Sequence, residues 1–340
     1  MNNQDKIVSV VILNWNGLHM LRRFLPSVLR YSPEARVIVA DNGSTDDSLL
    51  WLKSVEGVEV MAFPQNYGFA EGYNRALSQV STPYALLLND DVQVTEGWLS
   101  PLLNFMELHP NVAACQPKLR SEQRPSHFEY AGAAGGFMDR WGYPYCRGRM
   151  MDAVEEDYGQ YDSPVPVFWT TGAAMLVRTA VYLQCGGLDA QFFAHMEEID
   201  LCWRLRSRGH ELWCLPQSVV YHVGGATLPK GNPRKTFLNF RNNLLMLYKN
   251  VPNPQLWQVM AVRFFLDYAA ALQMLLSGRW GEARAVVKAR RAFWQMRPGY
   301  AAVRCENLHQ TILRQIPEQR GSSLLWAYYV RRIRCFSQWK

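Results

Sequence analysis

The chain has 340 residues, of which 49% are hydrophobic and 19% charged, so it can bury one large core or two modest ones. This composition excludes a disordered or low-complexity protein. The net charge of +7 is unevenly spread, because residues 1–229 hold 17 Lys and Arg against 25 Asp and Glu, while residues 230–340 hold 19 against 4. A basic, aromatic-rich tail on an acidic body favours an anionic membrane surface as a partner, and the tail has none of the motifs that indicate nucleic acid.

The cysteines and the N-terminus indicate a cytoplasmic protein. The seven cysteines are odd in number and form no CxxC pair, which argues against a disulfide framework or a structural zinc site. The first apolar run, Ile7 to Leu13, is short and lacks a basic n-region. We therefore expect no signal peptide.

Strands and helices alternate from the start of the chain. Ile7 to Leu13 is rich in β-branched residues and predicts a buried parallel strand, and Met20 to Arg30 predicts an amphipathic helix. A second strand over Arg36 to Ala40 runs into Asp41-Asn42-Gly43-Ser44, a turn signal, before a short helix from Thr45 to Ser54. A third strand follows at Val58 to Ala62.

The fourth strand lies in the stretch Tyr84 to Val94, where an apolar run is broken by Asn89-Asp90-Asp91. Four alternations of strand and helix predict a mostly parallel, doubly wound α/β sheet. Adjacent acidic side chains at the carboxyl end of a buried strand are typical of a site for a metal and a phosphorylated ligand. The alternative is that these residues only form a turn.

Two other segments fit a nucleotide site. Asp41, at the end of the second strand, could accept hydrogen bonds from the imide N–H of uracil or thymine, or from a ribose hydroxyl. Gly68 and Gly72 precede or begin an amphipathic helix, allow close backbone approach to a ligand, and lie where a helix N-terminus favours anions.

The order of these motifs resembles the family 2 glycosyltransferases of the GT-A fold, in particular the bacterial rhamnosyltransferase-like branch. The matching text runs from residue 7 to about residue 245 and comprises VSVVILNWNG (8–17), DNGSTD (41–46), NYGFAEGYN (66–74), LLNDD (87–91), TGA (171–173), GGLD (186–189) with Phe192-Phe193, and EEIDL (197–201) with Arg204 and Gly209.

The resemblance implies a GT-A domain over residues 1–250 and assigns roles to individual residues. Asp41 is the expected nucleobase contact, and Asp91 is the expected ligand of a divalent metal, Mn²⁺ or Mg²⁺. Asn89 stands where the family often has the first aspartate of a DxD element, so the metal would depend on Asp91, the diphosphate and water. The expected nucleotide-sugar site comprises Asn14, Asn16, Asp41, Asn42, Ser44, Asn66, Gly68, Phe69, Gly72, Asn74, Asn89, Asp90 and Arg241.

The resemblance also implies an inverting reaction with a carboxylate base. The base of the family falls on Glu198, with Asp200 as the alternative or as a helix-stabilising partner of Arg204 at i+4. The expected acceptor-binding residues are Trp169, Thr171, Gly172 and Glu197. A purely structural alternative is that acidic residues in the first turn of a helix from 197 to 208 only complement its dipole.

Two later segments complete the expected site. His222 lies at the end of a predicted strand. The resemblance implies that a histidine at this position completes the metal or diphosphate site. A nitrogen ligand would favour Mn²⁺ over Mg²⁺. Lys230, Arg234 and Lys235 begin a basic stretch that leads to Arg241, which we expect at the diphosphate.

Three further stretches shape the expected architecture. Residues 121–166 lose their periodicity and predict a structured wall of the sugar or acceptor site, or a surface excursion packed on itself. Phe168 to Val177 predicts another buried strand. Beyond Pro252 we expect a helical extension, residues 251–340. Within it, Leu256 to Leu276 carries too many polar residues to span a membrane. This segment instead predicts an amphipathic helix that binds a membrane surface, a partner or the catalytic domain.

Together these features predict transfer of a sugar, preferably L-rhamnose from dTDP-rhamnose, to a hydroxyl of a polysaccharide or lipid-linked glycan by a peripheral protein on the cytoplasmic face of the plasma membrane. Three alternatives stay open: a UDP-sugar donor, a non-catalytic sugar-nucleotide or glycan-binding protein, and a nucleotidyltransferase, although no lysine-rich loop follows the first strand. The sequence does not decide the oligomeric state.

Overall fold

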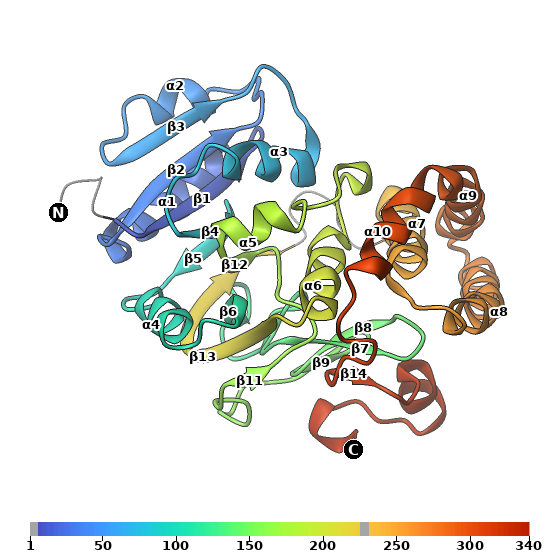
Figure 1. Cartoon of the computed structure of the whole chain (residues 1–340). Coiled ribbons are helices and arrows are strands. Elements are labelled where there is room, and N and C mark those ends of the chain that lie inside the picture. The colour runs from blue at the N-terminus through green and yellow to red at the C-terminus, as the bar shows by residue number, and fades with distance from the viewer. Residues whose placement is uncertain (1–5, 225–230, 340) are drawn as a thin grey trace.

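The computed structural model describes residues 6–224 and 231–339, which form a mixed α/β body with helices gathered at one end (Figure 1). The first half holds β1 (Val8–Asn14), α1 (Leu18–Tyr31), β2 (Ala35–Asp41), α2 (Ser48–Leu52), β3 (Val58–Ala62), α3 (Gly68–Leu77), β4 (Tyr84–Asn89), β5 (Val92–Val94), α4 (Ser100–Leu108) and β6 (Val112–Ser121).

The middle of the chain holds β7 (Gly136–Asp139), β8 (Pro144–Cys146), β9 (Arg149–Met150), β10 (Ala153–Val154), β11 (Val165–Pro166), β12 (Ala174–Arg178), α5 (Thr179–Gln184), the 3-10 helix η2 (Ala190–Phe192), α6 (Glu197–Ser207) and β13 (Glu211–His222). The C-terminal part holds α7 (Pro233–Asn250), α8 (Gln255–Leu276), α9 (Trp280–Met296), η3 (Arg297–Tyr300), α10 (Ala301–His309), β14 (Gln319–Arg320), η4 (Trp326–Val330) and η5 (Phe336–Gln338).

The central sheet has the order β11-β13-β6-β12-β4-β1-β2-β3, and β5 pairs with β13. The pairs β4-β1, β1-β2, β2-β3 and β13-β6 are parallel, while β12 runs antiparallel to both β4 and β6. The sheet therefore has the parallel N-terminal half that the alternating pattern predicts. Its second half is mixed, because β12 enters between β4 and β6 in the opposite direction.

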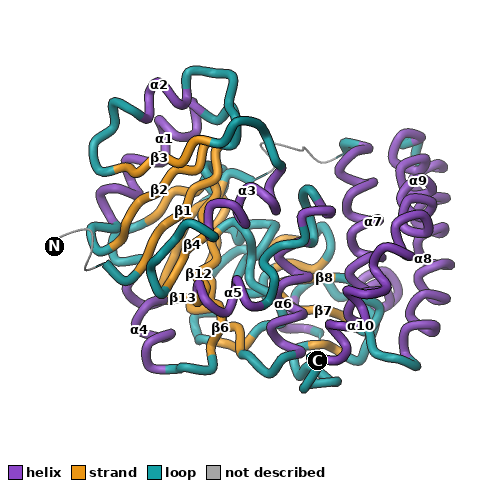
Figure 2. The backbone as a smooth tube through the Cα atoms, turned by 45° about the horizontal axis from the view of Figure 1, so that its top comes forward, coloured by secondary structure: helices purple, strands orange, loops and turns teal. Residues whose placement is uncertain are grey.

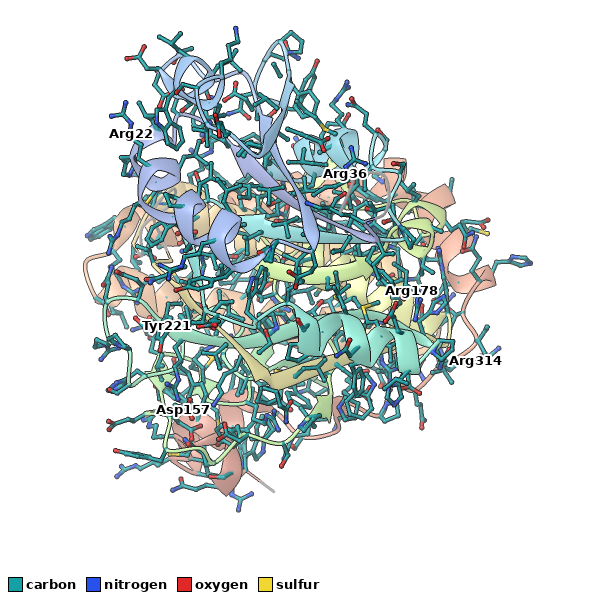
Figure 3. The ribbon with its side chains drawn as sticks, turned by 90° about the vertical axis from the view of Figure 1, so that its left-hand side faces the viewer. Arg22, Arg36, Asp157, Arg178, Tyr221 and Arg314 are labelled. Carbon is teal, nitrogen blue, oxygen red and sulfur yellow. The ribbon has the colours of Figure 1, made fainter. Side chains whose placement is uncertain are left out.

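One edge of this sheet collects the carboxyl ends of β1, β2, β4 and β13. Figure 3 shows Tyr221, near the end of β13, on the opposite side of the molecule from Arg36 at the start of β2 and Arg178 at the end of the antiparallel β12. Ligands of open α/β sheets bind at the carboxyl edge. The structure therefore indicates the edge near Tyr221 as the place for a ligand.

The predicted strand from Phe168 to Val177 is wrong in its first half, since β12 begins only at Ala174. The preceding residues turn instead: Thr171 N–H donates to Gln116 Oε1 over 2.9 Å and Thr171 Oγ1 donates to the carbonyl of Ala131 over 2.6 Å. The apolar run correctly predicts burial of these residues. However, these side-chain contacts take the place of the backbone hydrogen bonds to a neighbouring strand that a β-strand needs.

Within residues 121–166, the strands β7 to β10 (residues 136–154) form a small second sheet, and β11 joins the central sheet. The strands β10-β9-β8-β7 are antiparallel, and β14 from the C-terminal part adds to β7 in parallel. A separate apolar cluster on this sheet joins Tyr145 and Met150 to Leu324 and Trp339. The C-terminal residues thus cover this excursion.

The helices α7 to α10 lie together at the end of the molecule away from β1–β3, with α6 between them and the sheet (Figures 1 and 2). Apolar residues of this bundle, among them Leu245, Val259 and Phe293, belong to the same buried cluster as strand residues such as Val11 and Leu87. The helical extension therefore shares its core with the sheet domain.

Candidate functional site

The carboxyl ends of β1, β2 and β4 bring three of the predicted nucleotide-site residues together. In the parallel register Asn14 is paired with Asp41, and Leu13, the residue before Asn14, is paired with Asn89. Neighbouring strands lie about 5 Å apart. One ligand can therefore contact all three strand ends.

Asp41 is almost fully buried and is oriented by two donors. Asn14 Nδ2 donates to Asp41 Oδ1 over 2.8 Å, and the N–H of Ser44 donates to Asp41 Oδ2 over 3.1 Å. Asn14 is fixed in turn, because its Oδ1 accepts the N–H of Gly17 over 3.2 Å. Each oxygen of Asp41 keeps a lone pair, so the carboxylate can still accept a hydrogen bond from a base or a ribose.

Three asparagines of the predicted site shape the neighbouring turns. Asn16 Oδ1 accepts the N–H of Thr45 over 2.7 Å. Asn42 Nδ2 donates to Asn66 Oδ1 over 3.1 Å, and the same Asn66 oxygen accepts the N–H of Gly68 over 2.7 Å. These contacts tie the loops after β1, β2 and β3 into one rim at the sheet edge.

Gly68 and Gly72 permit close packing of α3 against other parts of the protein, and the predicted approach of a ligand to these glycines stays a prediction. Gly68 has φ +82°, and a Cβ there would lie 2.8 Å from the ring of Phe193. A Cβ at Gly72 would lie 2.9 Å from the side chain of Leu13. The first turn of α3, including Phe69, is therefore pressed between the end of β1 and the loop that precedes α6.

Asp90 and Asp91 project differently from the end of β4. The carboxylate of Asp90 lies against Gly17, where any side chain would collide with it. Asp91 Oδ1 is 3.0 Å from His222 Nε2, and Asp91 Oδ2 accepts the N–H of Gly224 over 3.2 Å. Burial and the charge of Asp91 raise the pKa of Asp90 to about 7.

His222 joins Asp91 to a residue that the sequence did not indicate, Glu129. The Nδ1 of His222 is 3.5 Å from Glu129 Oε1, and Nε2 is 3.4 Å from Asn89 Nδ2. Burial lowers the pKa of His222, but the charge of Glu129 and the hydrogen bond with Asp91 outweigh it and raise the pKa to about 10. Burial also opposes ionisation of Asp91, yet the hydrogen bond from His222 holds the pKa of Asp91 below its ordinary value.

The residues at this point fit a divalent cation as a partial ligand set. Within residues 6–224 and 231–339, no three His, Cys, Asp or Glu side chains gather so that they could hold a metal ion by themselves. Asp91 offers carboxylate oxygens to a cation, whereas His222 directs Nε2 to Asp91 and Nδ1 to Glu129, and its raised pKa keeps it protonated, without a lone pair for a metal. Asp91, supplemented by diphosphate oxygens and water, matches the ligand preference of Mn²⁺ or Mg²⁺. The role of His222 as a metal ligand stays a prediction.

Glu198 lies across the sheet edge from β4, beside Gly172. A Cβ at Gly172 would lie 3.6 Å from Glu198 Cβ and 3.5 Å from the ring of Phe69. Gly172 is two residues before Ala174, which is paired with Leu88 of β4. This register places Glu198 and Phe69 next to the strand end that carries Asp90 and Asp91.

The carboxylates of Glu197 and Glu198 are buried at the start of α6. The Oε2 atom of each is buried and has no hydrogen-bond partner among the described residues. Burial raises the pKa of Glu198 to about 7, and burial together with the charge of Glu198 raises the pKa of Glu197 well above its ordinary value. A carboxylate with a pKa near 7 is suited to proton transfer at neutral pH.

Asp200 is buried and bound by side chains of the protein interior. It forms the expected i,i+4 pair with Arg204 Nε at 3.1 Å, and its oxygens also accept from Lys249 Nζ and Asn250 Nδ2, each over 2.8 Å. Burial would raise the pKa of Asp200, but the charges of Lys249 and Arg204 hold it below the ordinary value. An ionised, fully paired carboxylate is a poor proton acceptor, so the geometry favours Glu198 over Asp200 as the base.

Three predicted site residues use their side chains for internal contacts. Asn74 Oδ1 accepts from Tyr182 over 2.7 Å and Asn74 Nδ2 donates to the carbonyl of Leu188 over 2.8 Å. Trp169 Nε1 donates to the carbonyl of Phe137 over 2.9 Å, and Thr171 is bonded as described above. Their assignment to the ligand site stays a prediction.

The loop between η2 and α6 is held by α7. Phe193, His195 and Met196 all have φ between +65° and +72°, a conformation that such side chains rarely adopt. Arg241 Nη2 donates to the carbonyl of Phe192 over 3.0 Å, so the residue expected at the diphosphate also fixes this loop. Arg234 and Lys235 lie at the start of α7, and Lys230 lies outside the described residues.

Asn242 was not indicated by the sequence, yet it is the main anchor of this loop. Its Nδ2 lies within 3.0 Å of the carbonyl oxygens of Phe192, Ala194 and His195. These bonds support the strained backbone that leads into Glu197 and Glu198. The only sequence signal for this role was the run of polar residues Arg241-Asn242-Asn243 beside the apolar residues of α7.

Replacing Asn242 with Asp should destabilise the protein and reduce turnover. The isosteric carboxylate would face three carbonyl oxygens and donate to none, at a cost of about 1–3 kcal/mol. Urea unfolding should show a lower midpoint and steady-state assays a lower kcat. Asn253→Asp is the matched control, since Asn253 Oδ1 only accepts, from Arg304 over 2.9 Å, and a carboxylate keeps that bond. Equal midpoints for the two variants would contradict the anchoring role.

Comparisons with known proteins show what the chain is similar to. The model of the family described as glycosyl transferase family 2 matches residues 9–173, which include the ends of β1, β2 and β4. N-acetylglucosaminyl-diphospho-decaprenol L-rhamnosyltransferase of Mycobacterium tuberculosis is 26% identical over 232 residues, covering 64% of this chain and 76% of that protein.

Solved structures share the fold at lower identity. GalNAc-T7, crystallised with UDP, GalNAc and Mn²⁺, matches with a TM-score of 0.55 and 16% identity over 72% of this chain and 48% of that chain. The mannosyltransferase PcManGT from Pyrobaculum calidifontis, in complex with GDP-Man and Mn²⁺, matches with a TM-score of 0.52 and 14% identity over 89% of this chain and 84% of that chain. The match over residues 9–173 and the relatives named here therefore support a glycosyltransferase of family 2 with the GT-A fold, similar to the rhamnosyltransferase-like branch.

Proposed function

We propose that the enzyme transfers a sugar with inversion, in a metal-dependent reaction, from a nucleotide diphosphate to a hydroxyl group of a polysaccharide or lipid-linked glycan. L-rhamnose from dTDP-rhamnose is the preferred donor, because the Mycobacterium tuberculosis relative is named as an L-rhamnosyltransferase acting on a decaprenol-linked diphosphate sugar. The observation that carries the proposal is the placement of Glu198 beside Gly172, next to the strand end with Asp91.

The proposed mechanism assigns one task to each end of this site. Asp41 and Asn14 hold the base and ribose, and Asp91, oriented by His222, would hold the metal. When bound, the cation offsets the charge that develops on the departing diphosphate. The sugar ring is placed beside Gly172, whose Cβ position lies in ordinary van der Waals contact with both Phe69 and Glu198.

Glu198 takes the proton in this mechanism. The acceptor oxygen attacks the anomeric carbon from the face opposite the diphosphate, so the new C–O bond forms as the bond to the diphosphate oxygen breaks. The hydroxyl proton passes to the Glu198 carboxylate. The base must be ionised, and a pKa of about 7 leaves a sufficient ionised fraction at neutral pH.

A thermal-shift screen tests the proposed donor class. A nucleoside diphosphate that binds the folded protein at a concentration of 100 times its Kd stabilises it by about 2.7 kcal/mol. We expect dTDP with Mn²⁺ to raise the melting temperature most, followed by UDP. ADP serves as the control, and dTDP-rhamnose should show the same preference for added Mn²⁺. A screen in which no nucleoside diphosphate shifts the midpoint would contradict the proposal.

A further inference from the structure

Helix α8 has its charged side chains inside and its large apolar side chains outside. Its sequence contains two charged residues, Arg263 and Asp267, and these are 2% and 0% exposed. Its largest exposed side chains are apolar or aromatic: Trp257 (66%), Phe264 (47%), Phe265 (72%), Tyr268 (39%), Leu272 (55%) and Leu276 (80%). A surface helix of a water-soluble domain has the opposite arrangement.

Ion pairs lock α8 in this orientation. Arg263 Nε pairs with Asp267 Oδ1 at 3.1 Å, and Arg290 Nη1 of α9 pairs with Asp267 Oδ2 at 2.6 Å. Arg263 also donates to Asn243 Oδ1 of α7. Turning the apolar side of α8 inward would leave these charges without partners, which is strongly unfavourable for buried groups. The outward apolar side is thus a fixed feature of the bundle.

Helix α9 extends the same surface. Trp280, Val287 and Trp294 are 61%, 49% and 54% exposed. Phe264 and Tyr268 of α8 and Val287 and Trp294 of α9 line a shallow hollow of about 460 Å³ between the two helices. We call the exposed apolar residues of α8 and α9 named here the α8–α9 face. Contiguous apolar surface of this kind marks a binding site for a membrane or another macromolecule.

Positive charge borders the α8–α9 face. Exposed basic residues on and beside α9 comprise Arg279, Arg284, Lys288, Arg291 and Arg297, while the acid of α9, Glu282, is buried. Residues 230–340 carry 19 Lys and Arg against 4 Asp and Glu. This charge is complementary to anionic lipid headgroups, and it would oppose pairing of the same face with a second copy of the chain.

We infer that the α8–α9 face binds the surface of an anionic lipid bilayer, with its aromatic side chains at the boundary of headgroups and acyl chains and its Arg and Lys side chains on the headgroups. In the described parts of the chain, α8 is the one helix that passes a length-and-composition test for a membrane span, although its polar residues argue against one in the sequence. Its ion pairs to α9 instead hold it in the bundle, so α8 lies in the plane of the membrane surface.

This inference deepens the proposed function, because it gives a place to a lipid-linked acceptor. In Figures 1 and 2 α6, which begins with Glu197 and Glu198, lies between the α7–α9 helices and the strands β1–β3. A membrane on the α8–α9 face would therefore lie on the side of α6 that faces away from the nucleotide-binding strands. The acceptor could approach from the membrane while the donor enters from solution.

Vesicle co-sedimentation of the full chain tests the inference. We expect binding to vesicles of phosphatidylcholine and phosphatidylglycerol, weak binding to phosphatidylcholine alone, and loss of binding as salt is raised. Phe265→Asn with Leu276→Asn, and separately Lys288→Glu with Arg291→Glu, should each weaken binding by about tenfold or more. Leu50→Asn with Leu108→Asn is the matched control, since these leucines are 71% and 77% exposed elsewhere on the surface and their substitution should not affect binding.

Several results would overturn the inference. One is equal binding of the wild-type and Phe265→Asn, Leu276→Asn proteins, and another is absence of binding to anionic vesicles. Resistance to alkaline carbonate extraction would contradict a surface location, and a dimer abolished by the same double substitution would identify a second copy as the occupant. The thermal shift caused by dTDP and Mn²⁺ reports separately on the proposed function. A variant that no longer binds vesicles should therefore still show this thermal shift.

Discussion

Replacement of Glu198 by Gln should reduce turnover by about 10²- to 10⁴-fold while nucleotide binding is preserved. The amide has nearly the same shape as the carboxylate, so the packing beside Gly172 and Phe69 is retained. It cannot accept the proton of the acceptor hydroxyl. The loss should therefore appear in kcat, with the thermal shift by dTDP and Mn²⁺ unchanged.

The pH dependence of kcat/KM gives a second readout for Glu198. A base must be ionised, so kcat/KM of the wild-type enzyme should be low in acid, rise with pH and level off above the Glu198 pKa of about 7. The residual rate of Glu198→Gln should lack this rise. Glu107→Gln is the matched control, because Glu107 is exposed on α4 and the substitution removes the same charge. Full turnover by Glu198→Gln would move the base to another group.

Substitution of Asp91 by Asn should remove the part of the nucleotide-induced thermal shift that depends on Mn²⁺. Asp91 is the charged side chain at the end of β4 that pairs with His222, and the amide brings no charge to a cation. Asparagine can still accept a hydrogen bond from His222 but loses the bond from the N–H of Gly224, so the unfolding midpoint of the variant is measured alongside the thermal shift. Turnover should fall because the departing diphosphate would lose its counter-charge.

Asp90→Asn separates the two neighbouring carboxylates. Asp90 lies against Gly17, away from the pair of Asp91 with His222, so its variant should retain the Mn²⁺-dependent shift. Titration calorimetry of Mn²⁺ into the complex with dTDP would compare the two variants directly. If Asp90→Asn loses Mn²⁺ binding and Asp91→Asn keeps it, the assignment of the metal ligand is wrong.

The parallel half of the sheet could be predicted from the sequence because each strand is a short, apolar run followed by a polar turn. The predicted strand at Val58 to Ala62 has the bounds of β3, and the predicted helix at Glu197 to Arg208 differs from α6 by one residue. The mixed parallel and antiparallel half of the sheet was not predicted, because the pattern of apolar residues does not reveal the direction in which a strand runs. The small sheet of residues 136–154 escaped prediction because its strands are only two to four residues long.

The strand ends of the candidate site could be predicted because local motifs mark them. Glu129 and Asn242 could not be predicted, because each contacts residues far away in the sequence. Glu129 lies beside His222, and Asn242 donates to carbonyl oxygens 47 to 50 residues earlier. The outward apolar side of α8 was indicated by its aromatic pattern. Its burial of Arg263 and Asp267 depends on Arg290 of another helix, which no pattern within α8 reveals.

A crystal of the enzyme grown with dTDP and Mn²⁺ would show the proposed donor site itself. We expect an anomalous Mn²⁺ peak at the carboxylate of Asp91 and beside the diphosphate, with the thymine ring next to Asp41 and with Glu198 facing the open side of the site. Mn²⁺ and nucleotide bound at any place that does not include Asp91 and Asp41 would contradict the proposal.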